Sequence, residues 1–169
     1  MAFEVEKDWA TKSGLRAVVT MGGMGCRCGY VGVPKEHPLY GAHYGDAHPN
    51  ITAHEDDEPA GKRGIITLIC ATLERMTSPE LAFDVHGSIT YSGNGDGKYP
   101  VESDLWWFGY DCAHAGDGRS PEYIEKQRER YPNSPIMWHD DGVFRSLEYC
   151  IGECESLARQ IVERTIIAA

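Results

Sequence analysis

An apolar stripe near the C-terminal end of the sequence constrains the fold more than any other feature. Its members recur at steps of three and four residues: Phe144, Leu147, Ile151, Cys154, Ala158, Ile161 and Thr165. This period places them on one side of an α-helix, and a helix with one apolar side needs a second layer to cover. The sequence therefore predicts a long C-terminal helix that packs against another layer of structure.

Runs of β-branched and apolar residues predict what that second layer is. Residues 15–21 form one such run, and residues 26–33 form another after a pair of glycines. Apolar and polar side chains alternate over residues 83–91, and a dense turn signal at 92–97 separates them from a predicted strand at 104–111. We expect these last two strands to pair as a β-hairpin. The predicted fold class is α+β, a twisted antiparallel sheet with the C-terminal helix packed on one face.

The length of the chain and its remaining segments fit one domain over residues 1–169. Residues 34–62 contain many prolines, glycines and histidines and predict a long loop, and we expect residues 42–64 to form a long loop or insertion. The apolar run at 65–76 fits either a buried strand or a short helix, because so brief a run does not define its period. A serine followed by a proline predicts a short polar helix over residues 120–130.

The balance of charge limits the partners that this chain can bind. It contains 26 acidic and 16 basic residues, which gives a formal net charge of -10. Proteins that bind long nucleic acids present a basic face, because phosphate neutralisation supplies most of the affinity. The sequence contains no such cluster, so we expect no long nucleic acid as a partner. A small anionic ligand is compatible with this net charge, since backbone N–H groups and single arginines can hold one phosphate.

The N-terminus and the cysteines indicate the cellular compartment. Residues 1–7 lack the basic and apolar regions of a signal peptide, and the apolar stretch at 65–73 is too short to span a bilayer. We therefore expect no membrane association, a cytoplasmic location and free thiols for the six cysteines. Cys150 and Cys154 fall on or beside the apolar stripe, so we predict that both are core residues rather than zinc ligands.

Residues 106–117, WWFGYDCAHAGD, offer the most chemistry in the sequence. Large aromatic side chains lead into Asp111, His114 and Asp117 at the predicted end of a strand, where scaffolds commonly present functional groups. His86 lies on the neighbouring predicted strand and faces the same place if the hairpin register is favourable. Two interpretations stay open: a ligand pocket with aromatic walls, or core aromatics followed by a polar turn.

The same polar residues also fit a metal site. Mixed sets of histidine and aspartate suit a zinc or manganese hydrolase that keeps one position open for water. If a divalent metal binds, we expect His86, Asp111, His114 and Asp117 to hold it, and if the chain is an enzyme, we expect these four to be its catalytic residues. No H-E-x-x-H motif accompanies them.

A second motif, CGYVGVPKEHPLYG, runs from a predicted strand into a loop over residues 28–41. Its glycines allow backbone N–H groups to approach a phosphate, and Lys35 adds a positive charge. Nothing in it matches a P-loop or a dinucleotide fingerprint. An ordinary turn at the exit of a strand is the competing interpretation.

Four segments together resemble a family of small proteins found in bacteriophage and prophage genomes. They are CGYVGVPKEHPLYG, VHGSITYSG, WWFGYDCAHAGD and the C-terminal LEYCIGECESLARQI. The resemblance covers most of residues 26–165 and leaves out residues 42–64. It implies no particular reaction. By analogy with phage proteins that antagonise host immunity, some by sequestering nucleotide second messengers, it implies a ligand-capturing protein in the host cytosol.

The function expected from the sequence is sequestration of a small nucleotide-derived molecule, such as an immune second messenger. The predicted ligand-binding residues are the aromatic and polar members of the motifs: Tyr30, Lys35, His37, Tyr40, His86, Trp106, Trp107, Tyr110, Asp111 and His114. This function needs no cofactor and is compatible with a homo-oligomer that builds its pocket between subunits. Two alternatives stay open, a metal-dependent hydrolase of a nucleotide or phosphoester, and a protein-binding inhibitor of a host factor.

Overall fold

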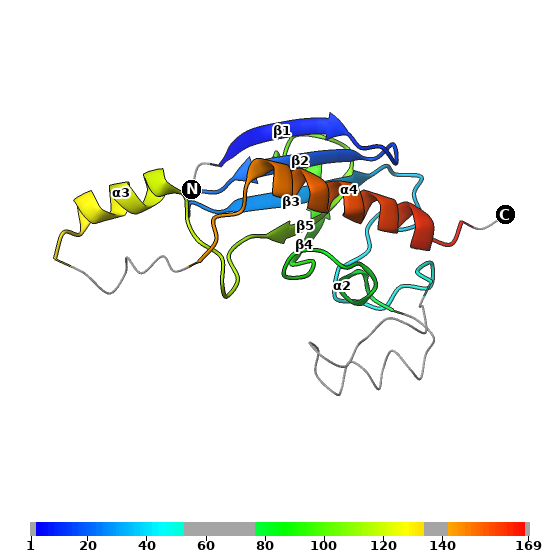
Figure 1. Ribbon diagram of the computed structural model, residues 1–169. Helices are drawn as coiled ribbons and strands as arrows, with labels where there is room; N and C mark the ends of the chain where they lie inside the picture. The colour runs from blue at the N-terminus through cyan, green and yellow to red at the C-terminus, as the bar shows by residue number, and fades with distance from the viewer. Residues whose placement is uncertain (1–2, 53–76, 134–141, 168–169) are drawn as a thin grey trace.

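A computed structural model of the chain describes residues 3–52, 77–133 and 142–167. They form a five-stranded antiparallel sheet in the order β1-β2-β3-β5-β4, and helix α4 lies across one face of it (Figure 1). The elements are β1 (Glu4–Ala10), β2 (Arg16–Met21), β3 (Arg27–Val33), α2 (Pro79–Ala82), β4 (Tyr91–Asn94), β5 (Trp106–Asp111), α3 (Pro121–Arg130) and α4 (Leu147–Arg164). The predicted α+β class, with the C-terminal helix packed on one face of the sheet, is confirmed.

Strand β3 lies at the centre of the sheet and determines which side chains share a face. It pairs with β2 on one side and with β5 on the other, where Cys28 lies opposite Asp111. Side chains alternate along a strand, so Val31 and Val33 point toward α4 whereas Cys28 and Tyr30 point to the opposite face.

Two apolar clusters cover the two faces of the sheet. The larger cluster lies between the sheet and α4, and the helix contributes Cys150, Cys154, Leu157, Ala158 and Ile161 to it, all fully buried. The smaller cluster is centred on Val18, Tyr30 and Trp107, with Tyr99, Val101 and Leu105 packed against it. The prediction that Cys150 and Cys154 are core residues is confirmed.

Helix α4 follows the predicted apolar stripe over most of its length. Ser146 is the N-cap, and its Oγ accepts a hydrogen bond of 3.1 Å from the backbone N of Tyr149. The two outermost members of the stripe lie outside the helix. Thr165 is the C-cap, and Phe144 precedes the N-cap and packs its ring 4.6 Å from the guanidinium carbon of Arg27.

Four other predicted elements are confirmed with small changes at their ends. The predicted strands at 15–21, 26–33 and 104–111 correspond to β2, β3 and β5, and the predicted helix at 120–130 corresponds to α3. Ser120 caps α3 through its hydroxyl, as its place in the sequence predicts. Helix α3 buries none of its residues and projects from one end of the sheet (Figure 1).

The predicted strand at 83–91 is wrong, although Phe83, Val85 and Ile89 are buried. Only its last residue belongs to β4, and the segment before β4 turns back on itself. Gly87 and Ser88 have φ angles of 68° and 98°, in the left-handed region that interrupts an extended chain. The N–H of Ser88 donates to the carbonyl of Val85 over 3.0 Å and closes the turn. His86 is therefore presented by a turn rather than by a strand.

The predicted hairpin is confirmed, because β4 and β5 pair antiparallel. The turn predicted at 92–97 is wrong in its first half. Residues 92–94 belong to β4, and the turn begins with the 3₁₀ segment Gly95–Gly97. Strand β1 is not predicted by the sequence pattern. It forms one edge of the sheet, most of its side chains are exposed, and a β-bulge lies between Val5 and Lys7.

Some predictions fall wholly or partly outside the described residues. The ambiguous run at 65–76 is one of them. Of the loop or insertion predicted at 42–64, the structure describes residues 42–52, which form turns and two isolated bridges.

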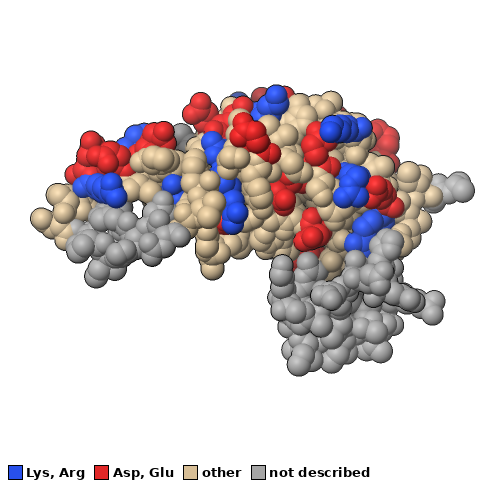
Figure 2. Space-filling model, viewed as in Figure 1, with Lys and Arg blue, Asp and Glu red and all other residues tan. Residues whose placement is uncertain are grey.

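Acidic and basic side chains are interspersed over the face of the molecule that carries α4 (Figure 2). This mixture agrees with the absence of a basic cluster in the sequence. Within the described part of the chain, no helix has both the length and the apolar character needed to cross a membrane.

Candidate functional site

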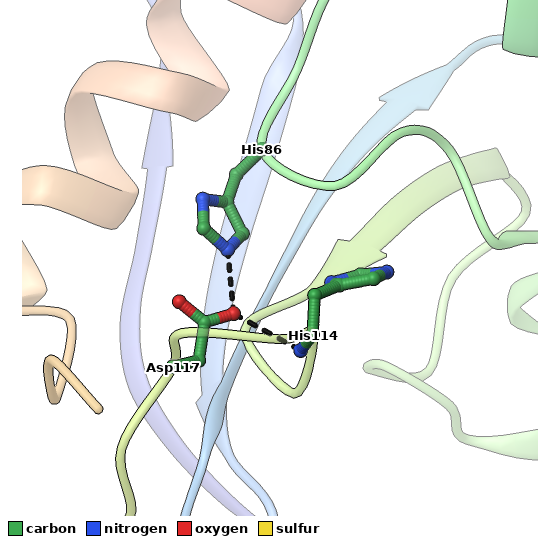
Figure 3. Close-up of side chains that lie close together, drawn as sticks. All are labelled: His86, His114 and Asp117. Atoms are coloured by element: carbon green, nitrogen blue, oxygen red, sulfur yellow. Dashed lines mark hydrogen bonds and ion pairs between the residues drawn. The ribbon is translucent and has the colours of Figure 1, made fainter. Parts of the chain in front are cut away.

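Three polar side chains converge where strand β5 ends, beside helix α4. One ligand atom from each of His86, His114 and Asp117 lies within 4.8 Å of the other two (Figure 3). His86 comes from the turn before β4, and the other two come from the turn after β5. That second turn is closed by a 3.0 Å hydrogen bond from the N–H of Asp117 to the carbonyl of His114.

Asp117 is the most enclosed member of this group, with 1% of its side chain exposed. Its Oδ2 lies 2.8 Å from Nε2 of His86 and accepts a 3.0 Å hydrogen bond from the backbone N–H of His114 (Figure 3). Its Oδ1 accepts a 2.8 Å hydrogen bond from Nε of Arg145. Burial acts to raise the pKa of Asp117, but the hydrogen bonds from Arg145, His86 and the His114 backbone outweigh it and lower the pKa. The carboxylate is therefore charged, as a metal ligand must be.

Helix α4 holds His86 at two points. The Nδ1 atom of the imidazole lies 3.0 Å from the hydroxyl of Tyr149, and the backbone N–H of His86 donates to Oε2 of Glu153 over 2.6 Å. Only 11% of the His86 side chain is exposed. These contacts fix the ring so that its remaining nitrogen, Nε2, points at Asp117.

His114 packs its ring against the turn that carries His86. The ring centroids of the two histidines lie 5.9 Å apart, and a Cβ atom at Gly87 would collide with the His114 imidazole. The Nδ1 atom of His114 is buried and has no hydrogen-bond partner among the residues that the structure describes. Buried polar atoms are normally satisfied, so this nitrogen is a natural ligand atom for a cation or a water molecule.

Asp111, the fourth predicted member, lies beside the group of three. Its Oδ1 is 3.7 Å from Nδ1 of His114, which is beyond hydrogen-bond range. Its oxygens instead accept hydrogen bonds of 3.0 Å from the hydroxyl of Thr90 and from the backbone N–H of Ala113. The structure thus brings together three of the four predicted ligands and places Asp111 at their border.

Two histidines and one carboxylate form a recognised donor set for zinc, manganese and ferrous iron, and three protein ligands leave positions open for water or substrate. Bonds of about 2.1 Å at right angles would separate two ligand atoms by about 3.0 Å. The 2.8 Å between Nε2 of His86 and Oδ2 of Asp117 is close to that separation. This pair therefore already has the spacing of two ligands, and the ligand atom of His114 lies within 4.8 Å of both.

Three of the predicted ligand-binding aromatics lie in the core. Tyr30 and Trp107 belong to the smaller cluster, and Tyr110 belongs to the larger cluster on the other face of the sheet. Each is at most 2% exposed, and the Tyr110 hydroxyl donates to the carbonyl of Cys150 over 3.0 Å. Their burial favours the core interpretation of these rings that the sequence left open.

The remaining predicted ligand-binding residues lie apart from the group of three. Tyr40 and Trp106 pack against each other with ring centroids 6.0 Å apart. Lys35 is exposed in a turn. His37 is half-buried, and burial lowers its pKa.

Three residues that contact the site were not predicted from the sequence. Arg145, Tyr149 and Glu153 approach Asp117 or His86 from α4 and from the residues just before it. Their spacing of four residues is a signal in the sequence, because it places polar side chains along one line of a helix. That line runs beside the apolar stripe. The residues that it contacts, Asp117 and His86, are distant in the sequence and become neighbours only in the folded chain.

Comparison with protein-family models, with curated proteins and with solved structures finds no match to this chain. The resemblance to phage proteins therefore stays an expectation drawn from the motifs.

Proposed function

We propose that this chain is a metal-dependent hydrolase in which His86, His114 and Asp117 bind one divalent transition-metal ion. The observation that carries the proposal is the convergence of three ligand atoms within 4.8 Å of one another. Two features of the site support it. Asp117 is buried yet held in its charged form, and Nδ1 of His114 is a buried nitrogen without a hydrogen-bond partner among the described residues.

The chemistry of the donor set favours hydrolysis. A bound divalent ion lowers the pKa of a water ligand toward about 7 and polarises the bond to be cleaved. Arg145 would keep the Asp117 carboxylate in place, and Tyr149 and Glu153 would hold His86. In known metal sites, hydrogen bonds of this kind to the metal-binding side chains orient them toward the ion.

A phosphoester or nucleotide is the substrate class that we propose. Asp111, Asp117 and Glu153 outnumber Arg145 around the site, so a phosphate would be repelled from the metal-free protein. A divalent ion would screen these carboxylates and give the phosphate a partner. Sequestration without a metal has less support, because Tyr30, Trp107 and Tyr110 are enclosed in the core.

The test measures metal binding and turnover by the same protein. Metal-free protein is titrated with Zn²⁺, Mn²⁺ and Fe²⁺ in a calorimeter, and the loaded protein is incubated with p-nitrophenyl phosphate, bis-p-nitrophenyl phosphate and linear and cyclic nucleotides. Mass spectrometry then identifies bound compounds and products. We expect one ion per chain and a hydrolysis product whose formation a chelator prevents.

A matched pair of variants links binding to the site. His114→Ala removes one ligand, and we expect it to weaken metal binding by more than the roughly 10–100-fold that loss of an outer contact costs. His43→Ala is the control, because 58% of the His43 side chain is exposed and it lies outside the group of three. We expect His43→Ala to bind metal like the wild type.

Three results would contradict the proposal. If the wild type takes up no metal, His86, His114 and Asp117 do not form a metal site. A nucleotide retained by the protein and recovered intact on heating would establish sequestration instead. Uptake of iron with consumption of oxygen would assign the two histidines and the carboxylate to oxidative chemistry.

A further inference from the structure

The hydrogen bonds of His86 raise a question about where its proton lies. A neutral imidazole carries one N–H, so one ring nitrogen donates while the other accepts. Nε2 lies 2.8 Å from Oδ2 of Asp117, and an ionised carboxylate can only accept. When the metal-free ring is neutral, it therefore carries its proton on Nε2, and Nδ1 accepts from the hydroxyl of Tyr149, 3.0 Å away.

Metal binding requires the opposite arrangement. A histidine that binds an ion through Nε2 offers a lone pair there, and its proton lies on Nδ1. That N–H must be donated to an acceptor, because the ring is largely buried, with 11% of its side chain exposed. A hydroxyl group both donates and accepts, so the oxygen of Tyr149 can satisfy Nδ1 in either arrangement.

Tyr149 is itself held in place for this task. It lies in the first turn of α4, where its backbone N–H donates to the Ser146 hydroxyl over 3.1 Å. The guanidinium carbon of Arg145 lies 5.2 Å from the centroid of the Tyr149 ring. The same arginine binds Asp117, so one side chain contacts both neighbours of the His86 imidazole.

We infer that Tyr149 is a positioning residue that anchors the His86 imidazole through Nδ1 in both of its tautomers. Nε2 can then exchange Asp117 for a metal ion while the ring keeps its orientation. The metal-bound half of this inference rests on the proposed function. The metal-free half rests only on the hydrogen bonds among Asp117, His86 and Tyr149.

The test compares Tyr149→Phe with Tyr123→Phe. The first variant removes the hydroxyl and keeps a ring that is already 37% exposed, so we expect it to fold. The second removes a hydroxyl from α3, which carries no residue of the site. Zinc affinity is measured by competition with a chromophoric chelator, and NMR of protein with ¹⁵N-labelled histidine reports which ring nitrogen of His86 is protonated.

In the neutral form of the ring, we expect wild-type His86 to be protonated on Nε2 without zinc and on Nδ1 with zinc. Tyr149→Phe should lose about 10–100-fold in zinc affinity, the range typical of an outer contact to a metal ligand. Its metal-free spectrum should keep the proton on Nε2, because Asp117 still accepts from that nitrogen, but the Nδ1 signal should shift because Nδ1 has lost the hydrogen bond from the Tyr149 hydroxyl. Tyr123→Phe should match the wild type in both measurements.

Unchanged zinc affinity together with unchanged ring-nitrogen signals in Tyr149→Phe would overturn the inference, and so would zinc bound to Nδ1 of His86. A wild type that takes up no zinc would overturn the proposed function. In that case the Nδ1 signal in the metal-free spectra would still decide whether the Tyr149 hydroxyl binds the His86 ring, so the two failures are distinguishable.

Discussion

At the scale of single residues, Asp117 connects most of the interactions in the site. Its two oxygens contact Arg145, the His86 ring and the His114 backbone, while 1% of its side chain is exposed. A buried carboxylate with these partners is costly to disturb, because removal of one member leaves the others without their charge partner. The sequence suggested Asp117 as a ligand but gave no indication of its burial.

Asp117→Asn should destabilise the protein in a pH-dependent way. The pKa of Asp117 is lower in the folded chain than the roughly 3.9 of an unfolded chain, so its contribution is complete above that value and is lost as the pH falls through the folded pKa. We expect a loss of about 1.5–3 kcal/mol at pH 7, the range for hydrogen bonds to a charged group, because Arg145 is 28% exposed while the carboxylate is enclosed. Urea unfolding between pH 3 and pH 7 should show this loss shrinking below about pH 4.

Asp8→Asn is the control for that measurement. Asp8 also pairs with an arginine, Arg16, but 35% of its side chain is exposed. Exposed ion pairs contribute less than about 1 kcal/mol, so this variant should stay close to the wild type. A loss in Asp117→Asn that is equal at every pH would contradict the role assigned to its charge.

Gly87→Ala should damage both the fold and the site. Gly87 has a φ of 68°, which costs an alanine about 1–2 kcal/mol, and the added Cβ would also collide with the His114 ring. Gly14→Ala separates the two effects, because Gly14 has a φ of 85° and nothing within 4 Å of its added Cβ. Urea unfolding and zinc titration should show a larger loss of stability for Gly87→Ala, and weakened zinc binding only there. Equal losses with intact zinc binding would disprove the contact.

At the scale of elements, α4 uses two sides for two purposes. Its apolar side covers the sheet, and Tyr149 and Glu153 on the neighbouring side hold His86. The packing of the apolar side could be predicted, since an apolar stripe repeated over five turns is typical of a helix that covers a second layer. The second purpose could not, because four-residue spacing of polar side chains is equally typical of a solvated helix face.

The strands were predictable to different degrees for physical reasons. β2, β3 and β5 are rich in buried apolar residues, so their patterns are strong. β1 is mostly exposed and charged, and it lacks such a pattern. The alternation over 83–91 suggested a strand because a hydrophobic pattern does not report φ angles, and the turn depends on the positive φ of Gly87 and Ser88.

Gly152→Ala should stabilise α4 without affecting the site. Gly152 is exposed within the helix, and a Cβ added there would meet nothing within 4 Å. Replacement of a helical glycine by alanine contributes about 0.5–1 kcal/mol through a smaller loss of backbone entropy. Thermal unfolding should show the gain, and zinc affinity should equal that of the wild type. A loss of stability would contradict the open surroundings of this position.

At the scale of the whole molecule, the site forms only when distant parts of the chain meet. Asp117 and His86 are 31 positions apart in the sequence, and Glu153 is 67 positions from His86. Local periodicity cannot encode such contacts, which explains why the sequence could suggest His86, His114 and Asp117 but not their arrangement. Burial of the sheet on both faces similarly placed Tyr30, Trp107 and Tyr110 in the core rather than in a shared pocket.

The exposed edge strand β1 has a consequence for how the protein behaves at high concentration. A regular edge offers unpaired backbone groups on which a strand of another molecule can add. Glu4, Lys7 and Asp8 place exposed charges along this edge, and the bulge between Val5 and Lys7 distorts its hydrogen-bonding pattern. Growth of the sheet from molecule to molecule is therefore disfavoured at β1, so this edge resists aggregation.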